Sequence, residues 1–166
     1  KNGALVFNGT DDRLAYNGFP SVSDGISISC FVKPAGLPLP SDVAIIGKNN
    51  NLLSISSTKI YWWPDINLSP ENPTIQNDND IWCHIGVTQS GSNCVIYKNG
   101  KPVHTNSATQ QFSTGGTQYT TIGAYNLGTS RFFSGSIASV AVYHRVLTQE
   151  EMLQNYNSLK TRFGLT

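Results

Sequence analysis

Short stretches of alternating or β-branched apolar residues recur along this chain, separated by glycine, asparagine, aspartate, serine or proline. In an extended strand, successive side chains point to opposite faces, so one face can pack inward while the other meets water. Several such strands with closely spaced turn residues are typical of an antiparallel sandwich. The stretches are A-L-V-F, I-S-I-S-C-F-V, V-A-I-I-G, L-L-S-I-S, K-I-Y-W-W, H-I-G-V-T, C-V-I-Y, T-T-I-G-A and S-I-A-S-V-A-V-Y.

Two-residue turns fix the predicted strand registers. Asn99 and Gly100 form the strongest hairpin signal, because both central residues of a type I′ turn need a positive φ. A turn at residues 91–92 places Cys94 opposite Gln89 and leaves Cys83 six residues further along the strand. At about 3.3 Å per residue this separation is roughly 20 Å, so we do not expect a disulfide between these two cysteines.

The stretch I-Y-W-W-P-D raises the question of which aromatic residues belong to the core. A turn at residues 57–58 would pair Leu53 with Trp62, which places Trp62 among the inward-facing residues. Tyr61 and Trp63 then lie on the opposite face, where a ligand can reach them. The sequence therefore predicts a core role for Trp62 and a ligand-contacting face for its two neighbours.

Only the end of the chain carries a helical pattern. Thr148 followed by Glu151 forms a capping box. One apolar stripe follows, comprising Met152, Tyr156, Leu159 and Phe163. We expect one short helix that covers an end or an edge of the sandwich.

Composition excludes several classes of function. The 166 residues suffice for one domain, predicted to span residues 1–166, and no linker divides them. Charged residues make up 13% of the chain and the net charge is +1, so no basic patch indicates a nucleic-acid partner. No apolar run approaches the roughly 20 residues that a membrane span requires.

Four stretches, in this order, resemble the laminin G-like branch of the concanavalin A-like lectin and glucanase superfamily. They are A-L-V-F-N-G-T-D-D-R-L, I-S-I-S-C-F-V-K-P, I-W-C-H-I-G-V-T with V-I-Y-K-N-G-K-P-V, and T-I-G-A-Y with F-S-G-S-I-A-S-V-A-V-Y-H-R-V-L-T-Q-E-E-M. The tail L-Q-N-Y-N-S-L-K-T-R-F-G-L is similar to the ends of such domains in phage and virus structural proteins. The resemblance implies an all-β, antiparallel jelly-roll sandwich of two curved sheets with one short C-terminal helix.

The glucanase branch of this superfamily hydrolyses polysaccharides with two acids on one strand, in the pattern E-x-D-x-x-E. Glycoside hydrolysis needs such a pair about 5 to 9 Å apart, and this sequence has no comparable pattern. His84, in the W-x-H strand, is predicted to be structural. His104 and His144 have no carboxylate or cysteine in a recognisable catalytic arrangement. We therefore expect no enzymatic activity and no catalytic residue.

Many relatives hold a structural calcium ion between an early loop and an acid on the closing strand. Asp11 and Asp12 lie in a suitable loop, but the family pattern G-x-I-D is replaced here by residues 135–138, which end in Ala138. Calcium prefers six to eight oxygen ligands, so the missing carboxylate disfavours the site. The sequence predicts no cofactor and no metal ligand, with weak structural calcium as the alternative.

The function that these features favour is a non-catalytic recognition module, carbohydrate-binding or adhesive, on a virion or extracellular surface. Aromatic faces stack on sugars and amides bind hydroxyl groups. The expected partner is a glycan or a surface protein, and the alternative is a virion structural or decoration domain that only self-assembles. A glycoside hydrolase is the least favoured class. Two groups of ligand-binding residues are predicted: Tyr61, Trp63, Asn49 and Asn51 in one, and Tyr125, Asn126 and Arg131 in the other.

Overall fold

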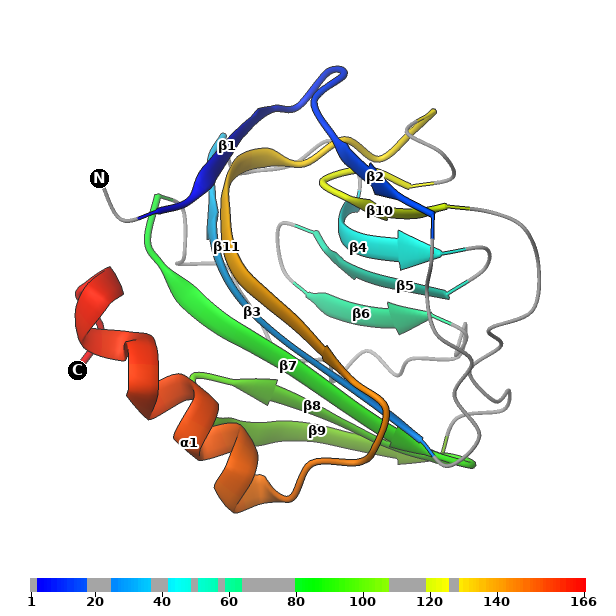
Figure 1. Ribbon diagram of the computed structural model, residues 1–166, viewed down its shortest axis with the longest axis vertical. Coiled ribbons are helices and arrows are strands. Elements are labelled where there is room, and N and C mark those ends of the chain that lie inside the picture. The colour runs from blue at the N-terminus through cyan, green and yellow to red at the C-terminus, as the bar shows by residue number, and fades with distance from the viewer. Residues whose placement is uncertain are drawn as a thin grey trace.

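The computed structural model describes residues 3–17, 25–36, 42–48, 51–56, 59–63, 80–107, 119–125 and 129–166. They form two antiparallel sheets with a helix outside one of them (Figure 1). The six-stranded sheet has the order β1 (Leu5–Asn8), β11 (Ser134–Tyr143), β3 (Ile26–Pro34), β7 (Cys83–Ser90), β8 (Asn93–Lys98) and β9 (Lys101–Ser107). The five-stranded sheet has the order β2 (Leu14–Tyr16), β10 (Thr120–Ile122), β4 (Val43–Lys48), β5 (Asn51–Ile55) and β6 (Ile60–Trp63).

The core lies between the two sheets. Ile28 and Val87 of the six-stranded sheet share one buried apolar cluster with Ile45, Leu53 and Trp62 of the five-stranded sheet. Neighbouring strands in both sheets run antiparallel, and the strand order departs from the order along the chain. The predicted all-β jelly-roll sandwich is confirmed.

The predicted hairpin registers are also confirmed. Leu53 pairs with Trp62, and the side chain of Trp62 is 1% exposed. Its indole Nε1–H donates a hydrogen bond of 2.7 Å to Oε1 of Gln89 on β7, so this contact joins the two sheets across the core. Gln89 itself pairs with Cys94, as expected. Parity along each strand was therefore sufficient to assign these side chains to a face.

The cysteines lie inside the sandwich rather than at its surface. Cys30, Cys83 and Cys94 are all buried. Burial raises the pKa of the Cys30 thiol to about 12, because a thiolate would lose its hydration there. Cys30 therefore stays protonated and acts as a small apolar core residue.

The C-terminal helix begins as the sequence predicted. Helix α1 (Gln149–Leu159) has Thr148 as its N-cap and a complete capping box with Glu151, and it continues into the 3₁₀ helix η2 (Lys160–Phe163). Within the described ranges, no helix is long and apolar enough to cross a membrane.

The position of α1 differs from the prediction of an end or an edge. Figure 1 shows the helix on the side of the six-stranded sheet that faces away from the other sheet. There Tyr156 packs with Phe31 of β3, and Met152 packs with Tyr97 of β8. The prediction was wrong because this sheet carries apolar residues on its outer face as well, and only a covering element can bury them.

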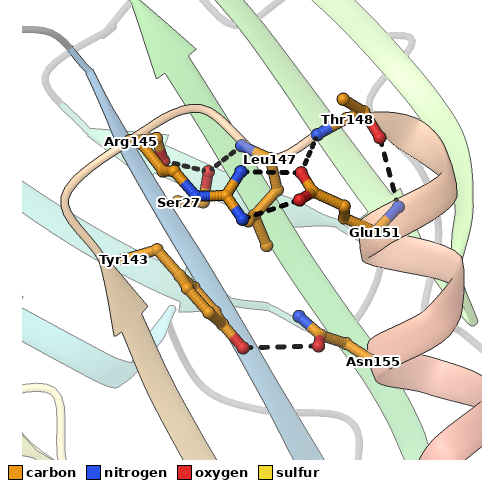
Figure 2. Close-up of polar contacts among 7 residues, drawn as sticks. All are labelled: Ser27, Tyr143, Arg145, Leu147, Thr148, Glu151 and Asn155. Carbon is orange, nitrogen blue, oxygen red and sulfur yellow. Dashed lines mark hydrogen bonds and ion pairs between the residues drawn. The ribbon is translucent and has the colours of Figure 1, made fainter.

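A polar network fixes the connection between β11 and α1, as Figure 2 shows. Oγ of Ser27 donates to the carbonyl of Arg145 and accepts from the N–H of Leu147, both at 2.8 Å. The guanidinium of Arg145 makes two hydrogen bonds, of 2.6 and 2.7 Å, to the Glu151 carboxylate. Hydrogen bonds from Arg145 and from the N–H of Thr148 lower the pKa of Glu151 to about 2. The segment from Arg145 to Thr148 thus joins the start of α1 to the sheet.

His84 has a structural role beneath this helix, as predicted. Its Nδ1 accepts the N–H of Gly100 at 3.3 Å, so the neutral ring carries its proton on Nε2, which lies 2.9 Å from Oγ of Ser29. Its backbone N–H donates to Oδ1 of Asn99, and its carbonyl accepts the N–H of Asn99. Burial lowers the pKa of His84 to about 4. His84 therefore anchors both residues of the Asn99-Gly100 turn.

Only glycine suits position 100. Its φ is +74°, and an added Cβ would lie 2.8 Å from Cδ1 of Leu153 and 3.0 Å from Cβ of Tyr156. The turn thus packs directly against α1, and the N-G pair that predicted a hairpin also permits helix docking.

We predict that Gln89→Leu lowers the free energy of unfolding by about 1 to 3 kcal/mol, because the buried Trp62 N–H loses its acceptor. Urea denaturation of the purified protein measures the change. Gln154→Leu, which alters an exposed glutamine on α1, is the matched control and should stay within about 0.5 kcal/mol of wild type. Equal stability of the two variants would contradict the assigned hydrogen bond.

We also predict that stability falls as the pH drops from 7 towards 4. The unfolded chain takes up a proton at His84 near its ordinary pKa of 6.5, whereas the folded protein does so only near pH 4. The stabilisation from the neutral ring is therefore complete above pH 6.5 and is lost as the pH falls to 4. The loss in the free energy of unfolding is roughly 3 kcal/mol. Urea denaturation at pH 7 and 4.5 should show this loss in wild type and in His144→Gln. A His84→Gln variant that kept the wild-type pH dependence would refute it.

Candidate functional site

A row of residues that includes Asp42, Ser54 and Tyr61 crosses the face of the five-stranded sheet away from the core. Ala44 of β4 pairs with Ser54 of β5, and Ser54 pairs with Tyr61 of β6. The residues that alternate with them belong to the core, so these three residues lie on the face away from it. Asp42 precedes Ala44 by two positions and lies on the same face.

The centre of this row is an ion pair. Nη1 of Arg131 contacts Oδ2 of Asp42, and Oγ of Ser54 donates to the same oxygen at 3.3 Å. The side chain of Arg131 is 33% exposed and that of Asp42 is 22% exposed. This partial burial orders the two charged groups and still leaves them accessible to a ligand.

Arg131 is held in an unusual backbone conformation. Its φ is +54°, in the left-handed region, which costs a residue with a side chain roughly 1 to 2 kcal/mol. Its carbonyl accepts the N–H of Ala44 at 2.8 Å, which fixes this segment beside β4. Strained residues of this kind cluster at ligand-binding positions.

Two tyrosines flank the ion pair. The Arg131 guanidinium lies over the Tyr125 ring, 5.3 Å from its centroid, and Tyr125 is itself placed by an antiparallel bridge to Ser130. At the other end of the row, the half-buried Tyr61 has its hydroxyl 3.5 Å from Oγ of Ser56. We call this set the Asp42–Arg131 surface. Its members are Asp42, Tyr61, Tyr125 and Arg131, together with Ser54, which is itself buried and holds Asp42 by a hydrogen bond.

The structure brings together three of the predicted site residues. Tyr61 came from one predicted group, and Tyr125 and Arg131 came from the other. Asp42 connects the two groups, because it contacts Arg131 and also Ser54, whose partner across the strands is Tyr61. Three residues from the two predicted groups are therefore linked through Asp42, and their role in ligand binding stays a prediction.

The other predicted residues cannot be assigned to this surface. Asn49 and Asn126 lie outside the described residues. Asn51 pairs with Lys48 and Trp63 pairs with Leu52, but the side chains of Asn51 and Trp63 also lie outside the described part of the structure. Their roles in ligand binding stay predictions.

Sequence reasoning missed Asp42. Counted back from the core residue Ile46 in strict alternation, Ala44 and Asp42 would face inward, where a lone carboxylate is unfavourable. A β-bulge between Ala44 and Ile46 reverses this parity. The short strand D-V-A-I-I-G, with four consecutive apolar residues that are all buried, was the signal that a bulge was present.

The loop that carries Asp11 and Asp12, where relatives hold calcium, makes several hydrogen bonds within itself. Oδ1 of Asn8 accepts the N–H groups of Thr10, Asp11 and Asp12. Asn8 in turn donates from Nδ2 to Asp11 at 2.7 Å and from its backbone to Asp12 at 2.9 Å. Ala138, at the position of the family carboxylate, packs beneath the C-terminal helix. In the described ranges, no three His, Cys, Asp or Glu residues form a group suited to a metal ion.

The sequence matches one family model, described as the concanavalin A-like lectin/glucanases superfamily, over residues 8–152. No curated protein matches the sequence of this chain. Several solved structures share the fold of this chain.

Domain 4 of AbnA, a GH43 extracellular arabinanase from Geobacillus stearothermophilus, has a TM-score of 0.67 and 20% identity, over 92% of this chain and 76% of that domain. A SAP-like pentraxin from Limulus polyphemus has a TM-score of 0.62 and 18% identity, over 91% of this chain and 80% of the pentraxin. A Trypanosoma rangeli sialidase has a TM-score of 0.70 and 16% identity. The match covers 98% of this chain but 29% of the sialidase. At these identities the likeness concerns the fold alone.

We predict that glycine is tolerated at position 131 better than alanine. Both substitutions remove the ion pair with Asp42, which is worth about 0 to 1 kcal/mol at this exposure. Only glycine adopts the left-handed backbone without strain. The free energy of unfolding of Arg131→Gly should therefore be about 1 kcal/mol higher than that of Arg131→Ala. Urea denaturation of the two variants decides the point. An alanine variant more stable than the glycine variant would mean that the backbone at Arg131 is unstrained.

Proposed function

We propose that this chain, which belongs to the concanavalin A-like lectin/glucanases superfamily, is a non-catalytic recognition domain that binds a carbohydrate on the Asp42–Arg131 surface. The observation that carries the proposal is an accessible ion pair flanked by two tyrosines on one face of a sheet. The fold and the family establish the class of protein, and the surface supplies a chemistry for binding.

That chemistry suits a sugar. The Asp42 carboxylate accepts hydrogen bonds from sugar hydroxyls, and a guanidinium such as that of Arg131 donates them. Tyrosine rings offer apolar faces to sugar C–H groups and a hydroxyl at the edge. Because the Asp42–Arg131 pair already fixes both charged groups, little side-chain entropy is lost when a ligand binds.

The structural neighbours support the class of ligand. Domain 4 of the extracellular arabinanase was solved in complex with arabinotriose. It shares 20% identity with this chain, so the comparison supports carbohydrate as a class and does not transfer any residue. The extracellular or virion-surface setting expected from the sequence stays a prediction.

The absence of catalysis is part of the proposal. Hydrolysis of a glycosidic bond uses two carboxyl groups about 5 to 9 Å apart. On the Asp42–Arg131 surface as described, Asp42 is the one carboxylate, and it is neutralised by Arg131. His84, beneath the helix, is held by Gly100 and Ser29 on the other sheet. These features favour binding over bond cleavage.

A glycan array with the purified chain tests the proposal, followed by calorimetric titration with the tightest ligand and with arabinotriose. We predict saturable binding by wild type and at least tenfold weaker binding by Arg131→Gly, which keeps the backbone favourable at that position. Arg13→Gly, at an exposed arginine outside the surface, is the control and should bind as wild type.

Unchanged binding by Arg131→Gly would place the ligand elsewhere. A folded wild-type protein that binds no glycan but assembles as its concentration rises would favour the alternative of a structural domain. Hydrolysis of any array ligand, detected by released reducing sugar, would refute the non-catalytic assignment.

A further inference from the structure

A second pocket lies on the opposite sheet, between the β8–β9 hairpin and the C-terminal helix. Its volume is about 470 Å³, which is within the range of small-ligand sites. The hairpin and the helix lie beside each other in Figure 1. We call it the lysine pocket. Its polar lining comprises Lys98, Lys101, Lys160, Asn99, Asn157, Tyr156 and Thr166, the last residue of this chain.

The pocket concentrates positive charge. Lys98 and Lys101 are direct partners in the β8–β9 register, and like charges at such positions destabilise a hairpin. Lys160 adds a third ammonium group from the first residue of η2. None of the described residues that line the pocket is acidic, and neither Lys101 nor Lys160 forms an ion pair within the described part of the chain.

A structural role explains only part of this arrangement. Lys160 follows the last residue of α1, where a cation interacts favourably with the helix dipole. That effect does not account for Lys101, which lines the pocket from β9. A bound anion would offset the charges of Lys101 and Lys160, whereas solvent and salt only screen them.

The walls of the pocket are preformed. Three hydrogen bonds between His84 and the Asn99-Gly100 turn fix the hairpin end. On the helix side, the hydroxyl of Tyr156 donates to the carbonyl of Thr166 at 3.0 Å, and Nζ of Lys160 lies 5.7 Å from the Tyr156 ring centroid. A pocket whose backbone walls are already fixed loses less entropy on binding a ligand than one that must first become ordered.

The rest of the lining indicates the kind of anion. Two asparagines provide amide groups for hydroxyls, and Val103 and Leu153 provide exposed apolar surface. Cations, amides and apolar surface in one pocket match an acidic sugar better than a bare inorganic ion. We propose that the lysine pocket binds an acidic saccharide through its carboxylate or sulfate group. This site is separate from the Asp42–Arg131 surface and does not depend on the function proposed for it.

The test is calorimetric titration of the full chain with trigalacturonic acid and with a heparin-derived tetrasaccharide, in 50 and 300 mM NaCl. We expect one of these probes to bind and to bind more weakly at the higher salt concentration. The double variant Lys101→Gln/Lys160→Gln should bind it at least tenfold more weakly. The double variant Arg13→Gln/Lys33→Gln removes the same charge outside the pocket and should stay within about twofold of wild type.

Three comparison probes distinguish the ligand class: maltotriose for neutral sugars, triglutamate for acidic peptides and inorganic sulfate for the bare anion. If any of them binds as tightly as the acidic saccharides, the proposal is overturned. It is also overturned if the Lys101→Gln/Lys160→Gln variant binds as wild type, or if neither acidic saccharide binds. Binding of the acidic probe that is lost in Arg131→Gly but kept in Lys101→Gln/Lys160→Gln would place the probe on the Asp42–Arg131 surface and overturn the proposal. The two tests can therefore fail independently.

A footprint locates the bound probe. Acylation of lysine amines, followed by mass spectrometry, should be slowed by the acidic saccharide at Lys101 and Lys160 and unchanged at Lys59. Equal protection of all three lysines would indicate nonspecific association with the surface and would contradict the assigned pocket.

Discussion

The burial of both faces of the six-stranded sheet is the constraint on which the rest of this structure depends. Its inner face packs on the five-stranded sheet, and its outer face packs on α1 through Phe31, Tyr97 and Tyr156. The helix covers that outer face. The two surfaces proposed for binding lie on the outer face of the other sheet and at the margin where the helix meets the β8–β9 hairpin.

Buried hydrogen bonds give these surfaces their rigidity. Trp62 and Gln89 join the two sheets through the core, and His84 joins β7 to the Asn99-Gly100 turn beneath the helix. A buried polar group is costly when it loses its partner, so each of these pairs favours one arrangement of its neighbours. Arg131 differs from these stabilising pairs, because its left-handed backbone conformation is unfavourable. The protein keeps this conformation at the position where the Arg131 side chain contacts Asp42 and Tyr125.

The two proposed sites differ in their electrostatics. On the Asp42–Arg131 surface a cation and an anion neutralise each other, so that surface selects by hydrogen bonds and aromatic contact. The lining of the lysine pocket includes three lysines and no acidic side chain among the described residues, so the proposed site would select by charge. One domain with both sites would hold a polysaccharide that carries neutral and acidic units at two positions. Linked contacts of this kind strengthen binding without any new interaction.

The sequence by itself determined the strands, the hairpin registers and the helix start, because these follow from parity, turn residues and capping within short segments. Those local rules assigned Trp62 to the core and placed Tyr61 beside Ser54 on the opposite face. Only the tertiary structure decided where α1 packs and that Asp42 joins Tyr61 to Arg131. The β-bulge at Ala44 reverses the parity of its strand. The contact between Asp42 and Arg131, and the pocket that both Lys101 and Lys160 line, bring together residues far apart in the chain. Such contacts arise only when separate elements meet, so no pattern within a single segment encodes them.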